Sequence, residues 1–263
     1  MQFSEILAQI TPPAEQAIQL PEGWGQGRAL FGGITAAIAW QHAHYGASSE
    51  QQLRAFTVSF VGPVQPGVAR LKRRILREGK NVTQIAVEII QNEQVVLSAL
   101  ASYGRSRSSS IEVPAEAPRG MPGPQQGISF PPVDILPEFT HYYDYRICVG
   151  NLPFTGNKLR ELGGWMRYRD EDKPIDIGLL LGLVDAWPPA LLPHLSSPAP
   201  ASSLTWTIEF PDNLPQNKRS SDWWQYLATI DHAANGYGHT HAYIWDDRGQ
   251  LVAISRQTVT VFG

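Results

Sequence analysis

The order of elements along this chain occurs twice, and that repetition constrains its fold more than any other feature. In the first half, alanine and large apolar residues at helical spacing predict a helix from Gly32 to Tyr45. Apolar and polar residues then alternate, which predicts strands at 53–61, 68–77, 82–90 and 95–103. Such strands have an apolar face that must be covered, and a single helix of this length is available to cover it.

The second half repeats this order. Apolar residues at helical spacing occupy 175–192, and Pro188 and Pro189 break the pattern near its end. Two extended segments are expected before this helix, at 142–148 and 164–169, and strands after it, at 203–210, 223–230, 239–245 and 250–262. The turn Asp246-Asp-Arg-Gly249 predicts that the last two strands form a hairpin. Each half is therefore predicted to be a helix followed by a four-stranded meander.

A proline-rich segment separates the two halves. Residues 105–137 contain seven prolines, three glycines and five serines, a composition that predicts an irregular linker. On either side of it, Phe56-Thr-Val-Ser-Phe60 is similar to Trp206-Thr-Ile-Glu-Phe210, which indicates a duplicated domain. We therefore expect an α+β fold with two antiparallel sheets, each wrapped around a central helix. The expected domains are 1–104 and 138–263, joined by the linker.

Composition excludes several classes of protein. With 43% hydrophobic residues and a net charge of −3, the chain is neither disordered nor basic enough for a typical nucleic-acid binder. Its one cysteine, Cys148, excludes an intrachain disulfide and a cysteine-based zinc site. The N-terminus has no secretory pattern, and no apolar stretch reaches the roughly 18 residues of a membrane span. We expect a cytoplasmic protein with no nucleic-acid or membrane partner.

Several common catalytic motifs are missing from the sequence. It has no Gly-x-Ser-x-Gly, no phosphate-binding loop ending in Gly-Lys-Ser/Thr and no His-Glu-x-x-His. Gly25-Gln-Gly27 lacks the third glycine of a dinucleotide site. His239 and His241 lie on one face of a predicted strand, where a metal pair is conceivable but a packed or solvent-facing pair is favoured. We expect no metal and no cofactor.

Motifs in the first half resemble a known family. Gly27-Arg-Ala-Leu-Phe-Gly-Gly33 opens the first helix and is followed by Arg54-Ala-Phe-Thr-Val-Ser-Phe60, Leu76-Arg-Glu-Gly-Lys-Asn81 and the strand ending in Ala-Ser-Tyr103. In order and spacing these motifs resemble acyl-CoA thioesterases with the double hot-dog fold, the bacterial thioesterase II type. The resemblance covers most of 27–103 and returns more weakly from 178 to 260. It implies hydrolysis of an acyl-CoA to a carboxylic acid and coenzyme A, and by analogy a homodimer or higher homo-oligomer.

The resemblance also implies a catalytic acid. In that family the base is an acidic residue on the second hot-dog helix, and the matching position here is Asp185. A carboxylate in so apolar a stretch must be paired, solvated by a cleft or functional, unless it simply marks the helix edge. Seven residues separate Gly178 from Asp185, whereas the residue seven past Gly33 is Trp40, which cannot take protons. Only the second half is therefore expected to carry a base.

Two further site residues follow from the same resemblance. The family's hydroxyl at the start of the next strand matches Ser203, with Thr205 as the alternative, and its glutamine on the last strand matches Gln257. These side chains would orient a water molecule for Asp185. The helix that opens at Gly32 and Gly33 would offer backbone N–H groups to the thioester carbonyl.

Other interpretations of the sequence remain open. Direct attack by Asp185, which gives an anhydride, is an alternative to water activation. Arg70, Lys72 and Arg74 could hold coenzyme A phosphates, although charge on a strand more often marks a solvated face. A hot-dog hydratase or dehydratase would need a histidine near the acid, and the next one is His194. The non-enzyme alternative is a hot-dog protein that binds acyl thioesters without cleaving them.

Overall fold

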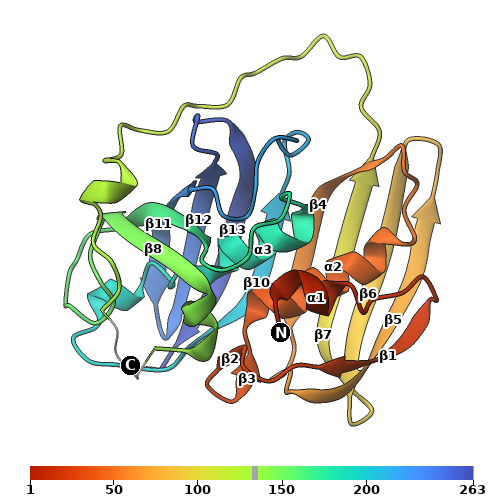
Figure 1. The fold of residues 1–263 in the computed structure, drawn as a ribbon, viewed down its shortest axis with the longest axis horizontal. Coiled ribbons are helices and arrows are strands. Elements are labelled where there is room, and N and C mark those ends of the chain that lie inside the picture. The colour runs from red at the N-terminus through yellow and green to blue at the C-terminus, as the bar shows by residue number, and fades with distance from the viewer. Residues whose placement is uncertain (132–135, 263) are drawn as a thin grey trace.

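Eleven strands of the chain form one antiparallel sheet, in the order β1-β5-β6-β7-β4-β10-β13-β12-β11-β9-β8 (Figure 1). The computed structural model describes residues 1–131 and 136–262. The strands of the sheet are β1 (Glu15–Leu20), β4 (Gln52–Phe60), β5 (Gly67–Glu78), β6 (Val82–Gln91), β7 (Gln94–Gly104), β8 (Tyr143–Val149), β9 (Glu161–Tyr168), β10 (Ala201–Glu209), β11 (Trp224–Ala234), β12 (Tyr237–Trp245) and β13 (Leu251–Val261). A separate two-stranded ribbon consists of β2 (Gly25–Gln26) and β3 (Ala29–Leu30).

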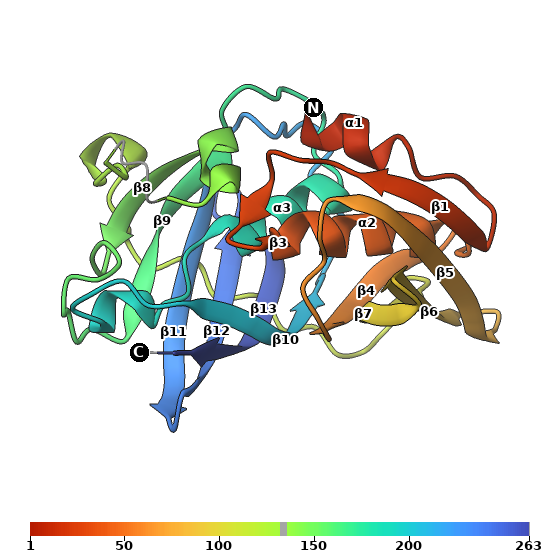
Figure 2. The same cartoon turned by 90° about the horizontal axis from the view of Figure 1, so that it is seen from below.

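Two helices lie on the concave face of this curved sheet, as Figure 2 shows. They are α2 (Gly32–His44) and α3 (Ile177–Ala186); the short elements are α1 (Phe3–Leu7), η1 (Pro124–Gln126), η2 (Glu138–Tyr142) and η3 (Leu192–His194). The Asp176 side chain caps α3 by accepting a hydrogen bond from the N–H of Leu179 at 2.8 Å. The helix ends before Trp187, which is extended because Pro188 follows it. In the described part of the chain, no helix is long and apolar enough to cross a bilayer.

The prediction of two separate sheets is wrong, because the halves join edge to edge. Strand β10 pairs with β4, so that Trp206 lies opposite Val58 and Ile208 lies opposite Phe56. All four side chains are fully buried. This pairing satisfies the backbone groups of two strands that would otherwise be open edges at the centre of the molecule. One continuous sheet therefore carries both helices.

The order of strands also differs from a simple meander, and in the same way in both halves. The first strand after each helix pairs with the last strand of its half: β4 with β7, and β10 with β13. Each of these pairs contains one register shift, between Leu53 and Ala55 in the first half and between Ser203 and Thr205 in the second. The shared irregularity supports the duplication that the sequence indicates.

The C-terminal part of the segment between the halves packs against the second half. Residues 105–123, all of them described, form neither helix nor strand, and Figure 1 shows them as a long yellow-green connection. The indole N–H of Trp165 donates to the carbonyl of Pro122 at 2.8 Å, and that of Trp245 to Glu116 at 3.4 Å. Residues 132–135 of the expected linker, and residue 263 of the expected second domain, lie outside the described residues.

Candidate active site

Asp185 lies in the last turn of α3 and faces the start of α2. A methyl group added at Gly32 would lie 2.7 Å from Oδ2 of Asp185, and one added at Gly33 would lie 3.1 Å from its Cβ. Glycine at both positions therefore lets a carboxylate from the second half approach a helix N-terminus from the first. The preceding residue, Phe31, has no side chain that can cap this end of α2. Instead, the backbone N–H of Gly33 hydrogen-bonds to the Asp185 carboxylate.

The structure brings the predicted amide and hydroxyl to the same carboxylate. Gln257 Nε2 donates to Oδ1 of Asp185 at 2.8 Å and to Oγ of Ser203 at 3.4 Å. The three side chains come from α3, β13 and β10, and all three are half-buried. The arrangement is a carboxylate, an amide and a hydroxyl held in one connected network, partly open to solvent.

The register shift in β10 decides which hydroxyl joins this network. Strict alternation would place Ser203 on the opposite face from the buried Trp206. The shift reverses that relation, so that Ser203 stands opposite the buried Val259 of β13 and shares the face of Gln257. Thr205 is exposed on the other face and does not join the network.

Burial controls the charge of Asp185. It raises the pKa of the carboxyl from its ordinary 3.8 to about 7, although the hydrogen bonds from Gln257 and the Gly33 N–H lower the pKa. Burial also raises the pKa of three phenols, those of Tyr143, Tyr145 and Tyr226, and the charge of Asp185 raises them further. A carboxyl that titrates near neutral pH is suited to accept and release protons.

Aromatic residues fix the end of α3 beside this carboxylate. The Tyr145 hydroxyl donates to the carbonyl of Ala186 at 3.1 Å. The ring of Trp187 stacks on Tyr226, with centroids 5.0 Å apart and an angle of 8° between the planes. These contacts hold the helix terminus that carries Asp185. The sequence did not single out either tyrosine, because only the topology brings β8 and β11 to this point.

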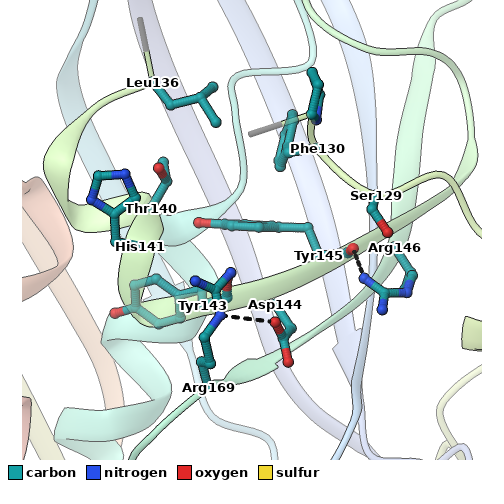
Figure 3. A pocket seen from close by; sticks show the side chains of 11 residues that line it. Ser129, Phe130, Leu136, Thr140, His141, Tyr143, Asp144, Tyr145, Arg146 and Arg169 are labelled. Atoms are coloured by element: carbon teal, nitrogen blue, oxygen red, sulfur yellow. Dashed lines mark hydrogen bonds and ion pairs between the residues drawn. The ribbon is translucent and has the colours of Figure 1, made fainter. Parts of the chain in front are cut away.

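A cavity of about 270 Å³ lies beside Tyr145, along the outer edge of β8. Figure 3 shows Tyr143 and Tyr145 in its wall, with Phe130 and Leu136 near its upper end, Arg146 at one side and Arg169 paired to Asp144 below. Arg169 Nε donates to Asp144 at 3.1 Å, and Arg146 donates to the backbone carbonyl of Tyr145 at 2.8 Å. The cavity is thus lined by both aromatic and cationic side chains.

The first half contains the counterpart of this site without its polar groups. A methyl group at Gly178 would lie 3.0 Å from the ring of Trp40, the same relation that Gly32 and Gly33 have to the acid. Leu53 occupies the position at the register shift that Ser203 has in the second half. Ala101, which lies opposite Phe56, occupies the position that Gln257 has opposite Trp206 in the second half. Indole, isobutyl and methyl groups thus replace acid, hydroxyl and amide.

The histidines that the sequence singled out lie away from Asp185. His241 Nδ1 hydrogen-bonds to Asp231 at 2.8 Å, and His239 Nδ1 contacts the hydroxyl of Thr258 at 3.3 Å, on the outer face of the sheet. The Nε2 of His194 contacts the carbonyl of Leu159 at 2.8 Å. Among residues 1–131 and 136–262, no three His, Cys, Asp or Glu side chains gather at distances that could hold a metal.

Two of the three basic strand residues, Arg70 and Lys72, form surface ion pairs. Glu15 on β1 lies 3.9 Å from Arg70 and 3.7 Å from Lys72, and Glu93 lies 3.1 Å from Arg70. All of these side chains are largely exposed, so the pairs contribute little to stability. This geometry is typical of a solvated sheet face.

Comparison with known proteins identifies the family of the chain. A family model described as "Acyl-CoA thioesterase N-terminal domain" matches residues 20–104, and one described as "Acyl-CoA thioesterase C-terminal domain" matches residues 113–261. No curated protein sequence matches the chain.

Solved structures show the same fold. A conserved protein of unknown function with the hot-dog fold, from Alicyclobacillus acidocaldarius, is 23% identical, with a TM-score of 0.88 over 99% of this chain and 98% of that one. The acyl-CoA thioesterase II TesB2 of Mycobacterium marinum is 20% identical, with a TM-score of 0.80 over 99% of this chain and 98% of that one. The chain thus has the hot-dog fold, and the C-terminal model alone matches more than half of its 263 residues. It therefore belongs to the acyl-CoA thioesterase family.

Proposed function

We propose that this protein hydrolyses an acyl-CoA thioester to a free carboxylic acid and coenzyme A. The observation that carries the proposal is the placement of Asp185, whose carboxylate is bound by Gln257 and lies against the start of α2. A general base, polar groups to orient water and helix N–H groups to receive a carbonyl oxygen are the components that thioester hydrolysis needs.

In the proposed mechanism, a water molecule held by Ser203 and Gln257 attacks the thioester carbonyl while Asp185 accepts its proton. The carbonyl oxygen gains negative charge, which the N-terminus of α2 stabilises through its N–H groups and dipole. The N–H of Gly32 donates to no backbone carbonyl in the described part of the chain, so it is available for this oxygen. The carbon–sulfur bond then breaks, and the proton held by Asp185 returns to the departing thiolate.

Direct attack by Asp185 would use the same carboxylate and give a mixed anhydride. A single turnover in ¹⁸O-labelled water separates water attack from an anhydride that opens at the enzyme carbonyl. Water attack places the label in the product acid, whereas an anhydride opened at the enzyme carbonyl places it in Asp185.

The test of the proposed function is release of free thiol from a panel of acyl-CoAs, with Asp185→Asn as the matched control. Hydrolysis by the wild type and its loss in the variant are expected. Binding of acyl-CoA without cleavage by the wild type would instead identify an acyl-thioester-binding protein. Hydration of an enoyl-CoA is not expected, because His194 is engaged by the Leu159 carbonyl.

A further inference from the structure

The cavity along the outer edge of β8 is joined to the site in two ways. Tyr145, in the cavity wall, donates to the carbonyl of Ala186, the residue after Asp185, at 3.1 Å. The helix η2 lines another part of the cavity, and its Phe139 stacks on Phe31, the residue before α2, with centroids 4.1 Å apart. One wall of the cavity therefore contacts the end of α3 that carries the acid, and another contacts the start of α2 that faces this acid.

Tyr145 also lies within reach of one charge from the cavity and one from the site. Burial raises the pKa of its phenol, the charge of Arg169 lowers that pKa, and the charge of Asp185 raises it. Arg169 lines the cavity, whereas Asp185 is the carboxylate that Gln257 binds. A ligand in the cavity is therefore close to the proposed site of the reaction.

The cavity wall carries more positive than negative charge. Arg146 and Arg169 line it, and Asp144 is the one acidic residue among the described residues that do. That carboxylate already has two cationic partners. Arg169 Nε donates to it at 3.1 Å, and Nε of Arg167, which is not part of the lining, donates to it at 3.0 Å. Three arginines thus surround one aspartate, and the surplus positive charge favours an anionic ligand.

The two arginines of the lining have N–H groups to spare. A guanidinium has five N–H donors. Arg146 uses one of them, on the carbonyl of Tyr145 at 2.8 Å. Arg169 uses two, on Asp144 and on the carbonyl of Tyr143 at 3.0 Å. In the described part of the chain, their other N–H groups donate to no protein acceptor. Planar guanidinium groups bind phosphate oxygens through two N–H groups at once.

Aromatic rings form the other part of the lining. Figure 3 shows Phe130, Tyr143 and Tyr145 around the same space, and Phe130 meets the ring of Tyr145 edge to face, with centroids 4.8 Å apart. A ligand that matches this wall has anionic groups next to a planar or apolar portion. The nucleotide end of coenzyme A, with its phosphates and its adenine ring, has both.

We infer that this cavity binds the phosphate-bearing nucleotide end of coenzyme A, with Arg146 and Arg169 as the groups that hold its phosphates. The inference rests on the proposed function, which places the thioester of an acyl-CoA between Asp185 and the start of α2. The pantetheine arm then connects the thioester to the cavity. Arg70 and Lys72, two of the cations that the sequence indicated for this role, are instead paired with surface carboxylates in the first half.

The first test measures the binding of coenzyme A by isothermal titration calorimetry, which requires no hydrolysis. Arg146→Gln and Arg169→Gln each remove one cation from the lining. Ser129→Glu instead adds an anion at an exposed position of the lining, where the serine side chain makes no hydrogen bond to the described residues. This third variant keeps the test decisive if loss of an arginine unfolds the protein, and thermal unfolding checks each variant.

Arg167→Gln is the matched control. Like Arg169, Arg167 donates to Asp144, and like Arg146 it lies over the ring of Trp223, but it does not line the cavity. The three cavity variants should each weaken the binding of coenzyme A by about tenfold, the equivalent of one charge-assisted hydrogen bond. Arg167→Gln should bind like the wild type. No binding by the wild type, unchanged binding in the cavity variants or an equal loss in Arg167→Gln would each overturn the inference.

The second test separates the nucleotide end from the rest of the substrate. For an acyl-CoA, the cavity variants should raise KM by about tenfold and leave kcat within about twofold. For the same acyl group carried on pantetheine, which has no nucleotide, KM should stay at the wild-type value. An equal rise in KM for both thioesters would show that the cavity holds the acyl or pantetheine part, and would overturn the inference. Failure of the proposed function is recognised separately, by the absence of thiol release from either thioester, and the calorimetry then still decides whether the cavity binds coenzyme A.

Discussion

The Nε2 of Gln257 on the last strand donates a 2.8 Å hydrogen bond to Oδ1 of Asp185 at the end of α3, although 72 residues separate the two in sequence. This bond lowers a pKa that burial raises to about 7. It therefore links the amide to the protonation state of the acid at neutral pH.

Replacing Gln257 by Leu should raise the pKa of Asp185 above about 7, because the donor that favours the carboxylate is lost. Thiol release at pH 7 should fall by about 10- to 100-fold and recover in part at pH 9. The measurement is kcat/KM against pH, with Gln94→Leu, an exposed position at a turn, as the control. A pH profile that coincides with that of the wild type would show that Gln257 does not affect the protonation of Asp185.

Replacing Ser203 by Ala should lower kcat by about 3- to 10-fold, since its bond to Gln257 is long at 3.4 Å. Thr205→Ala should leave kcat unchanged, because Thr205 is exposed on the other face. Combined with Gln257→Leu, the Ser203 change should cost less than it does alone. A larger loss of kcat in Thr205→Ala than in Ser203→Ala would contradict Ser203 as the hydroxyl of the site.

Gly32→Ala should abolish most hydrolysis, by about 100-fold or more, because displacement of a reacting group by even 1 Å is costly. The new methyl would lie 2.7 Å from Oδ2 of Asp185 and 3.2 Å from the ring of Phe60. Gly62→Ala is the control, with its nearest contact at 3.8 Å. Steady-state rates together with thermal melting separate a blocked site from an unfolded protein. Full activity in Gly32→Ala would contradict the placement of Asp185 against the start of α2.

Asp185→Asn should gain stability relative to the wild type as pH rises. Between its ordinary 3.8 and the raised value of about 7, the unfolded chain has released the proton that the folded chain still holds. The wild type therefore loses stability across this window, by about 1–3 kcal/mol after solvent screening, and the asparagine variant does not. Urea unfolding at pH 5 and pH 8 measures the free energy of unfolding of both proteins. A difference between them that does not change with pH would mean that Asp185 titrates normally.

Local pattern predicted much of the fold. The alternation at Phe56–Phe60 and Trp206–Phe210 identified β4 and β10, and helical spacing identified α2 and α3. Periodicity carries no information about which strand edges meet, so the pairing of β4 with β10 and the resulting single sheet could not be derived. The family resemblance pointed to Asp185 and Gln257, which the structure brings together.

The hydroxyl partner illustrates what alternation cannot give. The pattern around Trp206 predicts that Ser203 and Thr205 point the same way, whereas the register shift between them separates their faces.

The most direct measurement is the pH dependence of kcat/KM for acyl-CoA hydrolysis by the wild type and by Asp185→Asn. The wild-type rate should rise about tenfold per pH unit below the pKa of Asp185 and level off above it. The variant, folded but without a base, should be slower by about 1,000-fold or more at pH 8. A variant within threefold of the wild type, or a wild-type profile that is flat across neutral pH, would contradict Asp185 as the base.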